Sequence, residues 1–133
     1  MSDCDAELTH DIFLGGALKI WQPREGYRAA TDPVLLAASV SAMPGDSALE
    51  LGCGVGVAIL ALGKRVPGMD LSGVERQLDY AALARRNAAE NDVAAQVTTA
   101  DIMAIPATLK RGFDHVLLNP PYYLPSAPAS ENV

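Results

Sequence analysis

The sequence of 133 residues contains few cysteines and histidines: Cys4 and Cys53, His10 and His115. Two cysteines cannot form the disulfide framework of a small secreted domain, and neither has the spacing of zinc ligands. No apolar run reaches the ~18 residues that cross a bilayer, and the acidic N-terminus lacks the features of a signal peptide. We therefore expect a soluble, reduced, cytoplasmic protein without a metal or a membrane partner.

Basic residues are also scarce, because 10 Lys and Arg stand against 16 Asp and Glu and the formal net charge is -6. This balance argues against a general nucleic-acid-binding surface, although it leaves a local basic groove open. Three basic pairs are typical of solvated helix ends or of phosphate contacts, namely Lys64-Arg65, Arg85-Arg86 and Lys110-Arg111. Half of the residues are hydrophobic, which indicates a folded chain of single-domain size.

The chain divides into a short tail and one domain. Residues 1–11 contain acids but no Lys or Arg, so we expect an acidic flexible tail, followed by a single domain over 12–133. Residues 12–21 alternate weakly around Gly15-Gly16, which is typical of a hairpin. The remaining pattern predicts strands over 48–51, 71–75, 95–99 and 113–118, and helices over 34–40, 57–66, 77–91 and 103–110. For the 77–91 helix we expect Leu78, Ala82, Leu83 and Ala89 to form the apolar face.

The alternation of strands and helices predicts an α/β, Rossmann-like, doubly wound and mostly parallel sheet. Ligands of such sheets bind beyond the carboxyl ends of the strands. A sheet of four strands would leave the 113–118 strand as an apolar edge, which proteins usually protect. We therefore expect that the C-terminal strands are missing from this chain, and that residues 12–133 are the N-terminal part of a longer domain.

A glycine cluster follows the first strand of this sheet, from Glu50 through Gly52, Gly54 and Gly56. Glycines allow a sharp turn and let a ligand approach the backbone, and the next helix begins with free N–H groups. A plain strand-to-helix turn would have the same composition. The spacing is not the dinucleotide fingerprint G-x-G-x-x-G, whose third glycine would fall on Val57.

Polar residues stand at the ends of the later strands. Glu75 could accept both hydroxyls of a ribose, or it could simply be a solvent-facing strand end. Asp101 could bond an adenine amino group, or it could cap the helical stretch that follows it. Asn119-Pro120-Pro121-Tyr122 offers free acceptor oxygens and an aromatic ring, because proline removes backbone donors. Together these groups could hold a planar amino group.

These motifs resemble those of class I S-adenosylmethionine-dependent methyltransferases over about residues 12–124. The N-P-P-Y sequence is similar to that of the branch that methylates amino groups on planar systems. The segment 26–36, which includes Thr31-Asp32-Pro33, resembles the corresponding segment of bacterial tRNA adenine N6-methyltransferases.

The resemblance implies a role for each motif. Gly52, Gly54 and Gly56 would face the methionine part of S-adenosylmethionine, with Glu50 near its amino group. Glu75 would bind the ribose hydroxyls and Asp101 the adenine. The residues implied at the target amine are Asn119, the Pro120 carbonyl and the stacking ring of Tyr122. Tyr27, Arg28, Thr31 and Asp32 would line the cofactor or target side, although Asp32 before Pro33 also suits a helix cap.

The implied reaction is methyl transfer from S-adenosylmethionine to the exocyclic amino group of adenine in tRNA. Alternatives are a glutamine methyltransferase acting on a protein release factor, an rRNA guanine amino methyltransferase, or a catalytically incomplete cofactor-binding fragment. No general base is required in advance, and we expect His115 to be a packing residue. If RNA is the substrate, we expect its basic binding surface in the missing C-terminal portion.

Overall fold

A parallel sheet of four strands forms the centre of the computed structural model, which describes residues 7–25 and 32–119. Its strands are β3 (Ser47–Leu51), β4 (Asp70–Glu75), β5 (Ala95–Thr99) and β6 (His115–Leu118), in the spatial order β5-β4-β3-β6. Every pairing is parallel, and β3 lies between β4 and β6. The predicted α/β fold with a parallel sheet is therefore confirmed.

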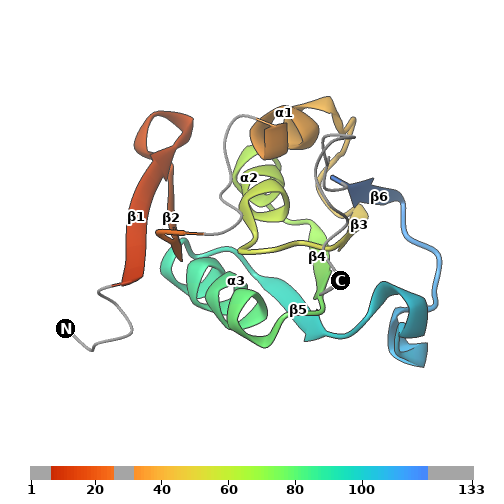
Figure 1. Cartoon of the computed structure of the whole chain (residues 1–133). Coiled ribbons are helices and arrows are strands. Elements are labelled where there is room, and N and C mark those ends of the chain that lie inside the picture. The colour runs from red at the N-terminus through yellow and green to blue at the C-terminus, as the bar shows by residue number, and fades with distance from the viewer. Residues whose placement is uncertain (1–6, 26–31, 120–133) are drawn as a thin grey trace, which may run out of the picture.

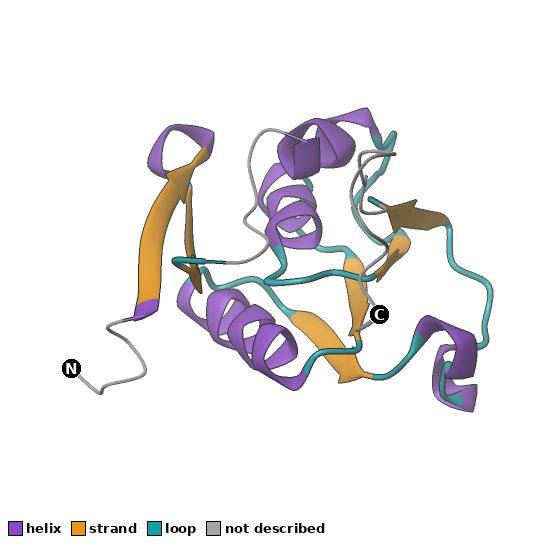
Figure 2. Ribbon diagram, viewed as in Figure 1, coloured by secondary structure: helices purple, strands orange, loops and turns teal. Residues whose placement is uncertain are grey.

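Helices cover one face of this sheet (Figures 1 and 2). They are α1 (Asp32–Ser39), α2 (Val57–Arg65) and α3 (Leu78–Glu90). Alternate strand residues point to the same face of a sheet, and Ala48, Leu71 and Leu117 join the core that α2 supplies with Ile59 and Leu60. Burial of these side chains fixes the register of the strands, because a shift by one residue would expose them.

The opposite face of the sheet carries a smaller cluster. Leu49 and Val74 pack there against Leu109 and Ile105. The segment that supplies them contains two 3-10 turns, η3 (Ile102–Ala104) and η4 (Ala107–Leu109), so the single helix predicted over 103–110 is wrong. Pro106 precedes η4, and a proline there removes the backbone donor that a continuous helix would need.

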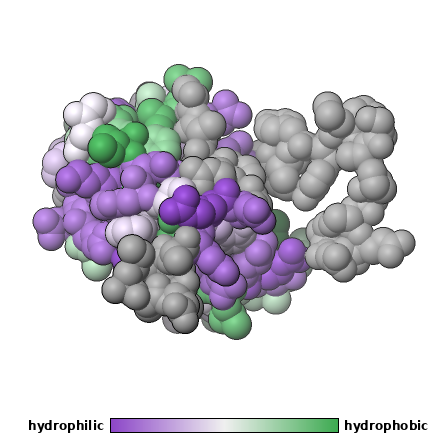
Figure 3. Space-filling model, turned by 60° about the vertical axis from the view of Figure 1, so that its left-hand side comes forward, coloured by the Kyte–Doolittle hydropathy of each residue, from purple (hydrophilic) through white to green (hydrophobic). Residues whose placement is uncertain are grey.

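An antiparallel hairpin lies on the far side of the helices (Figure 1). It consists of β1 (Leu8–Phe13) and β2 (Leu18–Pro23), joined by the turn η2 (Leu14–Gly16). The predicted hairpin is confirmed, but residues 8–11 belong to β1 and not to the expected flexible tail. Leu18 and Ile20 are fully buried and join the main core. The hairpin side of the molecule is mostly hydrophilic, with apolar residues toward its upper and lower margins (Figure 3).

The buried face of α3 differs from the predicted one. Leu78 is 74% exposed, whereas Ala81 and Ala84 are almost fully buried. Small side chains face inward because α3 lies between the sheet and the hairpin, where close approach excludes larger groups. Within the described residues, no helix is long and apolar enough to cross a membrane.

Candidate functional site

The candidate site lies at the carboxyl edge of the sheet. Because the strands are parallel, their carboxyl ends meet at one edge. Glu75 ends β4, Glu50 is the last but one residue of β3, and Asn119 directly follows β6. Asp101 comes shortly after β5. The topology thus brings to one edge four side chains that stand far apart in the sequence.

The glycine cluster forms a tight loop between β3 and α2. Gly54 has φ +56° and Gly56 has φ +98°, in the left-handed region that favours glycine. A Cβ on Gly56 would lie at ordinary contact distance, 3.5 Å, from the Ala84 side chain, so the positive φ and not a lack of space favours glycine there. A Cβ on Gly52 or Gly54 would meet no atom within 4 Å. The first part of the loop therefore leaves open space beside its backbone.

Glu75 holds this loop with its carboxylate. The Gly54 N–H donates to Glu75 Oε1 at 3.0 Å, and the Gln77 N–H donates to Oε2 at 2.8 Å. The Cys53 N–H adds a bond of 2.9 Å to the Val74 carbonyl. Glu75 is only 8% exposed, which excludes the alternative of a solvent-facing strand end. Each carboxylate oxygen can accept a further hydrogen bond.

A second carboxyl group is buried beneath the loop. Glu50 is 3% exposed, and its Oε1 accepts a hydrogen bond of 3.1 Å from the Ile59 N–H in the first turn of α2. The pKa of Glu50 is raised to about 8, mainly because the group is buried; the Ile59 bond lowers the pKa and the negative charge of Glu75 adds to the rise. A positively charged ligand beside Glu50 would therefore stabilise the ionised form of this carboxyl group.

Sequence reasoning missed the importance of Gly73 in β4. A Cβ at this position would lie 2.9 Å from Cys53 Sγ and 3.1 Å from Cys53 Cβ. The glycine makes room for Cys53, which is buried and follows Gly52 in the loop. Burial, with Glu50 and Glu75 nearby, raises the pKa of the Cys53 thiol, so this cysteine fills space and is not a nucleophile.

Of the remaining predicted site residues, the structure describes Asp101 and Asp32. Asp101 caps η3, since its Oδ1 accepts a hydrogen bond of 2.9 Å from the Met103 N–H, and its side chain stays exposed at the site edge. Asp32 is exposed in the first turn of α1. The other predicted positions lie outside the described residues, namely Tyr27, Arg28, Thr31, Pro120 and Tyr122.

Several basic side chains contact other residues of the chain. Arg65 donates to the Ala37 and Val40 carbonyls, and Arg85 donates to the Val97 carbonyl. Arg86 lies over the ring of Trp21, and Arg111 pairs with Asp70 at 3.0 Å. These contacts favour the structural interpretation of the basic pairs. Among the residues that the structure describes, no cluster of His, Cys, Asp and Glu could hold a metal ion.

The loop and its acids fit S-adenosylmethionine. This cofactor combines a positively charged amino acid part with a ribose whose hydroxyls donate hydrogen bonds. Open space beside Gly52 and Gly54 allows backbone approach, and Glu50 and Glu75 supply acceptors and negative charge. A parallel sheet with a glycine loop after its central strand β3 and an acid at the end of β4 is the arrangement of class I methyltransferases.

Comparison with known proteins identifies the family. The model of the methyltransferase small domain matches residues 30–130, and the chain belongs to this family of S-adenosylmethionine-dependent enzymes. The tRNA (uracil-54, C5)-methyltransferase of Pyrococcus abyssi, solved with S-adenosyl-L-homocysteine, is similar in structure. Its TM-score is 0.64 and its identity 26%, with 83% of this chain and 27% of that chain covered. The predicted family resemblance and cofactor are confirmed.

Two curated relatives carry the same name, tRNA1(Val) (adenine(37)-N6)-methyltransferase. The protein from Yersinia enterocolitica is 31% identical over 102 residues, which cover 74% of this chain and 41% of the relative. The protein from an Enterobacter species is 32% identical over 128 residues, which cover 94% of this chain and 52% of the relative. The chain thus spans about half the length of these relatives.

Proposed function

We propose that this chain forms the cofactor-binding and amine-binding part of an enzyme that methylates the exocyclic amino group of adenine in tRNA. The observation that carries this proposal is the position of Asn119 directly after β6, next to β3, which leads into the glycine loop. The methyl donor and the target amine would then be held by neighbouring strands. The relatives named tRNA1(Val) (adenine(37)-N6)-methyltransferase, including the two described above, support adenine as target and tRNA as partner. We also propose that the enzyme acts in the cytoplasm.

The chain's own residues would bind and align the reactants. S-adenosylmethionine supplies a methyl group on a sulfonium, which is a good leaving group. Glu75, already oriented by Gly54 and Gln77, would accept from the ribose hydroxyls, and Asp101 would accept from the adenine amino group. Glu50 would face the ammonium group, and Gly52, Gly54 and Gly56 the methionine chain. Alignment of this kind is a large part of catalysis for a transfer between two bound groups.

The target amine would be held on the other side of the donor. The Asn119 amide oxygen and the Pro120 carbonyl would each accept one amine hydrogen, and Tyr122 would stack on the base. These bonds favour the tetrahedral amine of the transition state. Tyr27, Arg28, Thr31 and Asp32 would line the cofactor or the target side of the site. The proton would leave to water after transfer, which requires no histidine.

The positions of both histidines agree with this mechanism. His10 stacks on Trp21 in the hairpin, with ring centroids 4.1 Å apart. His115 begins β6, at the amino edge of the sheet, and pairs with Asp46 at 3.0 Å. The carboxyl edge therefore lies at the opposite end of β6 from His115. We expected His115 to be a packing residue, and it is half-buried with its ring in contact with Asp46.

Labelled methyl transfer tests the proposal. The purified chain is incubated with methyl-labelled S-adenosylmethionine and unmodified tRNA, or with a release factor protein, and the products are identified by mass spectrometry. We expect N6-methyladenosine in tRNA, and none of it with Asn119→Ala, whose affinity for S-adenosylhomocysteine should stay within about threefold. Label on a protein glutamine would favour the release-factor alternative. If the protein binds S-adenosylhomocysteine but transfers no methyl group, the result would favour the alternative of a catalytically incomplete cofactor-binding fragment.

A further inference from the structure

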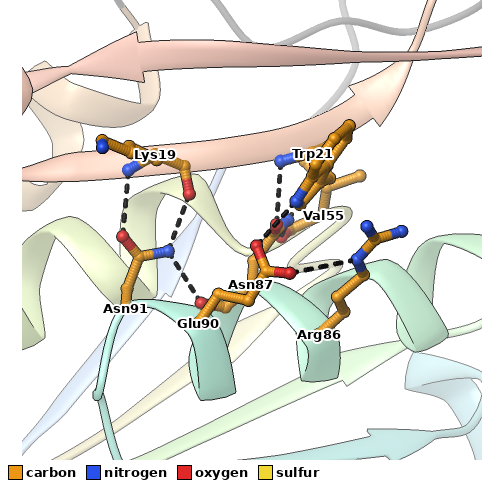
Figure 4. Close-up of polar contacts among 7 residues, drawn as sticks. All are labelled: Lys19, Trp21, Val55, Arg86, Asn87, Glu90 and Asn91. Carbon is orange, nitrogen blue, oxygen red and sulfur yellow. Dashed lines mark hydrogen bonds and ion pairs between the residues drawn. The ribbon is translucent and has the colours of Figure 1, made fainter. Parts of the chain in front are cut away.

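Two asparagines, Asn87 in α3 and Asn91 directly after its last residue, hold the hairpin by its backbone (Figure 4). Asn87 Oδ1 accepts from the Trp21 N–H at 2.8 Å, and its Nδ2 donates to the Trp21 carbonyl at 3.0 Å. Asn91 does the same with Lys19, at 2.9 Å and 2.7 Å. Each carboxamide therefore pairs with β2 as a neighbouring strand would, along the edge of β2 that faces away from β1.

The spacing of the two asparagines suits this pairing. Residues four apart on a helix are separated by about 6 Å along its axis. Residues two apart on a strand are separated by about 6.8 Å. Asn87 is completely buried and Asn91 is 7% exposed, so water cannot replace these bonds at low cost. The match explains why two polar side chains occupy the inner face of α3.

The two asparagines differ in their third hydrogen bond. Asn91 Nδ2 also donates to the Asn87 carbonyl in the last turn of α3, at 2.7 Å. Asn87 Nδ2 also donates to the Val55 carbonyl at 2.9 Å (Figure 4). Val55 lies between Gly54 and Gly56 in the glycine loop. Of the two asparagines, Asn87 therefore connects the hairpin with the loop at the candidate cofactor site, and Asn91 does not.

This bond adds to the contacts that hold the loop. Cys53 and Gly54 are anchored to β4 through Val74 and Glu75. The carbonyl of Val55 turns the other way, toward α3. The same peptide is held at its other end by the Gly56 N–H, which donates to the Cys53 carbonyl at 2.9 Å. Without Asn87 the buried Val55 carbonyl would lose its partner, and one of the two hydrogen bonds that orient this peptide would be lost.

We propose that Asn87 is a positioning residue that fixes the glycine loop for cofactor binding and couples the loop to the hairpin. This inference rests on the proposed cofactor site and assigns no contact between Asn87 and the cofactor. The coupling is reciprocal, so a cofactor that orders the loop also stabilises the Asn87–Trp21 contact. The hairpin therefore contributes to cofactor binding through Asn87, in addition to packing against the helices.

The matched variants Asn87→Ala and Asn91→Ala test the proposal. Each variant removes a pair of equivalent bonds to β2, to Trp21 in Asn87→Ala and to Lys19 in Asn91→Ala. Both should therefore lower the thermal midpoint by similar amounts. The hairpin keeps other contacts with α3, including the Trp21 Nε1–H bond to Glu90 at 2.6 Å, so we expect both variants to fold. Affinity for S-adenosylhomocysteine, measured by calorimetry, should fall about 5- to 30-fold in Asn87→Ala. In Asn91→Ala it should stay within about twofold.

Equal losses of affinity in the two variants, or no loss in Asn87→Ala, would overturn the inference. Hydrogen exchange of the unmodified protein gives a second test that needs no variant. S-adenosylhomocysteine should slow exchange of the Trp21 amide, which bonds Asn87, more than that of the Lys19 amide, which bonds Asn91. Equal effects on the two amides would contradict the coupling. Absence of any binding by the unmodified protein would instead refute the proposed cofactor function.

Discussion

At the scale of single residues, the two buried carboxyl groups differ in what they do. Glu75 accepts hydrogen bonds from two backbone N–H groups, whereas Glu50 accepts one from the Ile59 N–H and has a pKa that burial raises to about 8. Hydrogen bonds from N–H groups favour an ionised carboxylate, and burial without them favours the neutral acid. We therefore expect the charge of Glu50 to vary with pH near neutrality.

Removing the charge of Glu75 should weaken cofactor binding. Glu75→Gln keeps an acceptor oxygen for one of its two N–H partners but provides only neutral bonds to a ribose. Since a bond to a charged group contributes about 1.5–3 kcal/mol, we expect roughly a 10-fold loss of affinity for S-adenosylhomocysteine by calorimetry. The control Asp79→Asn removes the same charge from an exposed residue in the first turn of α3 and should change the affinity less than about twofold. Equal affinities in the two variants would remove Glu75 from the ribose role.

Glu50 should make the stability of the unliganded protein depend on pH. Its pKa is about 8 in the folded chain against an ordinary value of 4.5. A raised pKa means that the folded state binds the proton more tightly, so the stabilisation is complete below 4.5 and is lost as pH rises through 8. The free energy of unfolding should fall between pH 5.5 and 8.5, by at most about 1.4 kcal/mol per pH unit from this group.

Denaturant titrations at several pH values measure this dependence. Glu50→Gln preserves the acceptor for the Ile59 N–H but cannot ionise, so its curve should be flatter than that of the unmodified protein over this range. Parallel curves for the two proteins would show that Glu50 is ionised in the folded state throughout.

At the scale of elements, the contact between β4 and the glycine loop depends on Gly73. An alanine Cβ would lie 2.9 Å from Cys53 Sγ, so Cys53 and the loop would have to move. We expect Gly73→Ala to lower the free energy of unfolding by about 1–3 kcal/mol in a denaturant titration. Gly112→Ala is the control, since its Cβ meets no atom within 4 Å. The double variant with Cys53→Ala should recover part of the loss, and a strictly additive double variant would contradict the steric explanation.

Elements with local signals could be predicted from the sequence. The strand over Ala95–Thr99 has the predicted bounds, and α2 differs from its prediction by one residue at its end. The sequence-based predictions were wrong where contacts between elements determine which side chains are buried. Leu78 was expected inside because it is apolar, but the close approach of α3 to its neighbours selects Ala81 and Ala84. Asn87 and Asn91 could not be predicted, because hydrophobic periodicity gives no signal for a polar side chain that pairs with a strand edge.

The site itself was predictable only in part. The order of strands along the chain places Glu75 and Asn119 at carboxyl ends, and the parallel pairing confirms that these ends share one edge. The partners of Glu75 were not predictable, because they depend on how the glycine loop folds back onto β4. Roles at the target amine and the cofactor remain proposals for the experiments above.

At the scale of the whole molecule, the two faces of the sheet are unequally covered. In β6, Leu117 faces the helices and is 2% exposed, whereas Val116 and Leu118 on the opposite face are 60% and 50% exposed. Within the described residues β6 pairs only with β3 and forms an edge of the sheet, as the sequence predicted. Exposed apolar residues on an edge strand favour association with other chains.

We therefore expect concentration-dependent self-association, which the double variant Val116→Lys with Leu118→Lys should reduce in sedimentation velocity. Because both side chains lie largely in solvent, this variant should change the free energy of unfolding by no more than about 0.5 kcal/mol. Leu117→Ala, on the covered face, should instead cost about 2–5 kcal/mol. If the lysine variant were as destabilised as Leu117→Ala, the second face of β6 would be packed in solution, and the sheet would be covered on both sides at this edge.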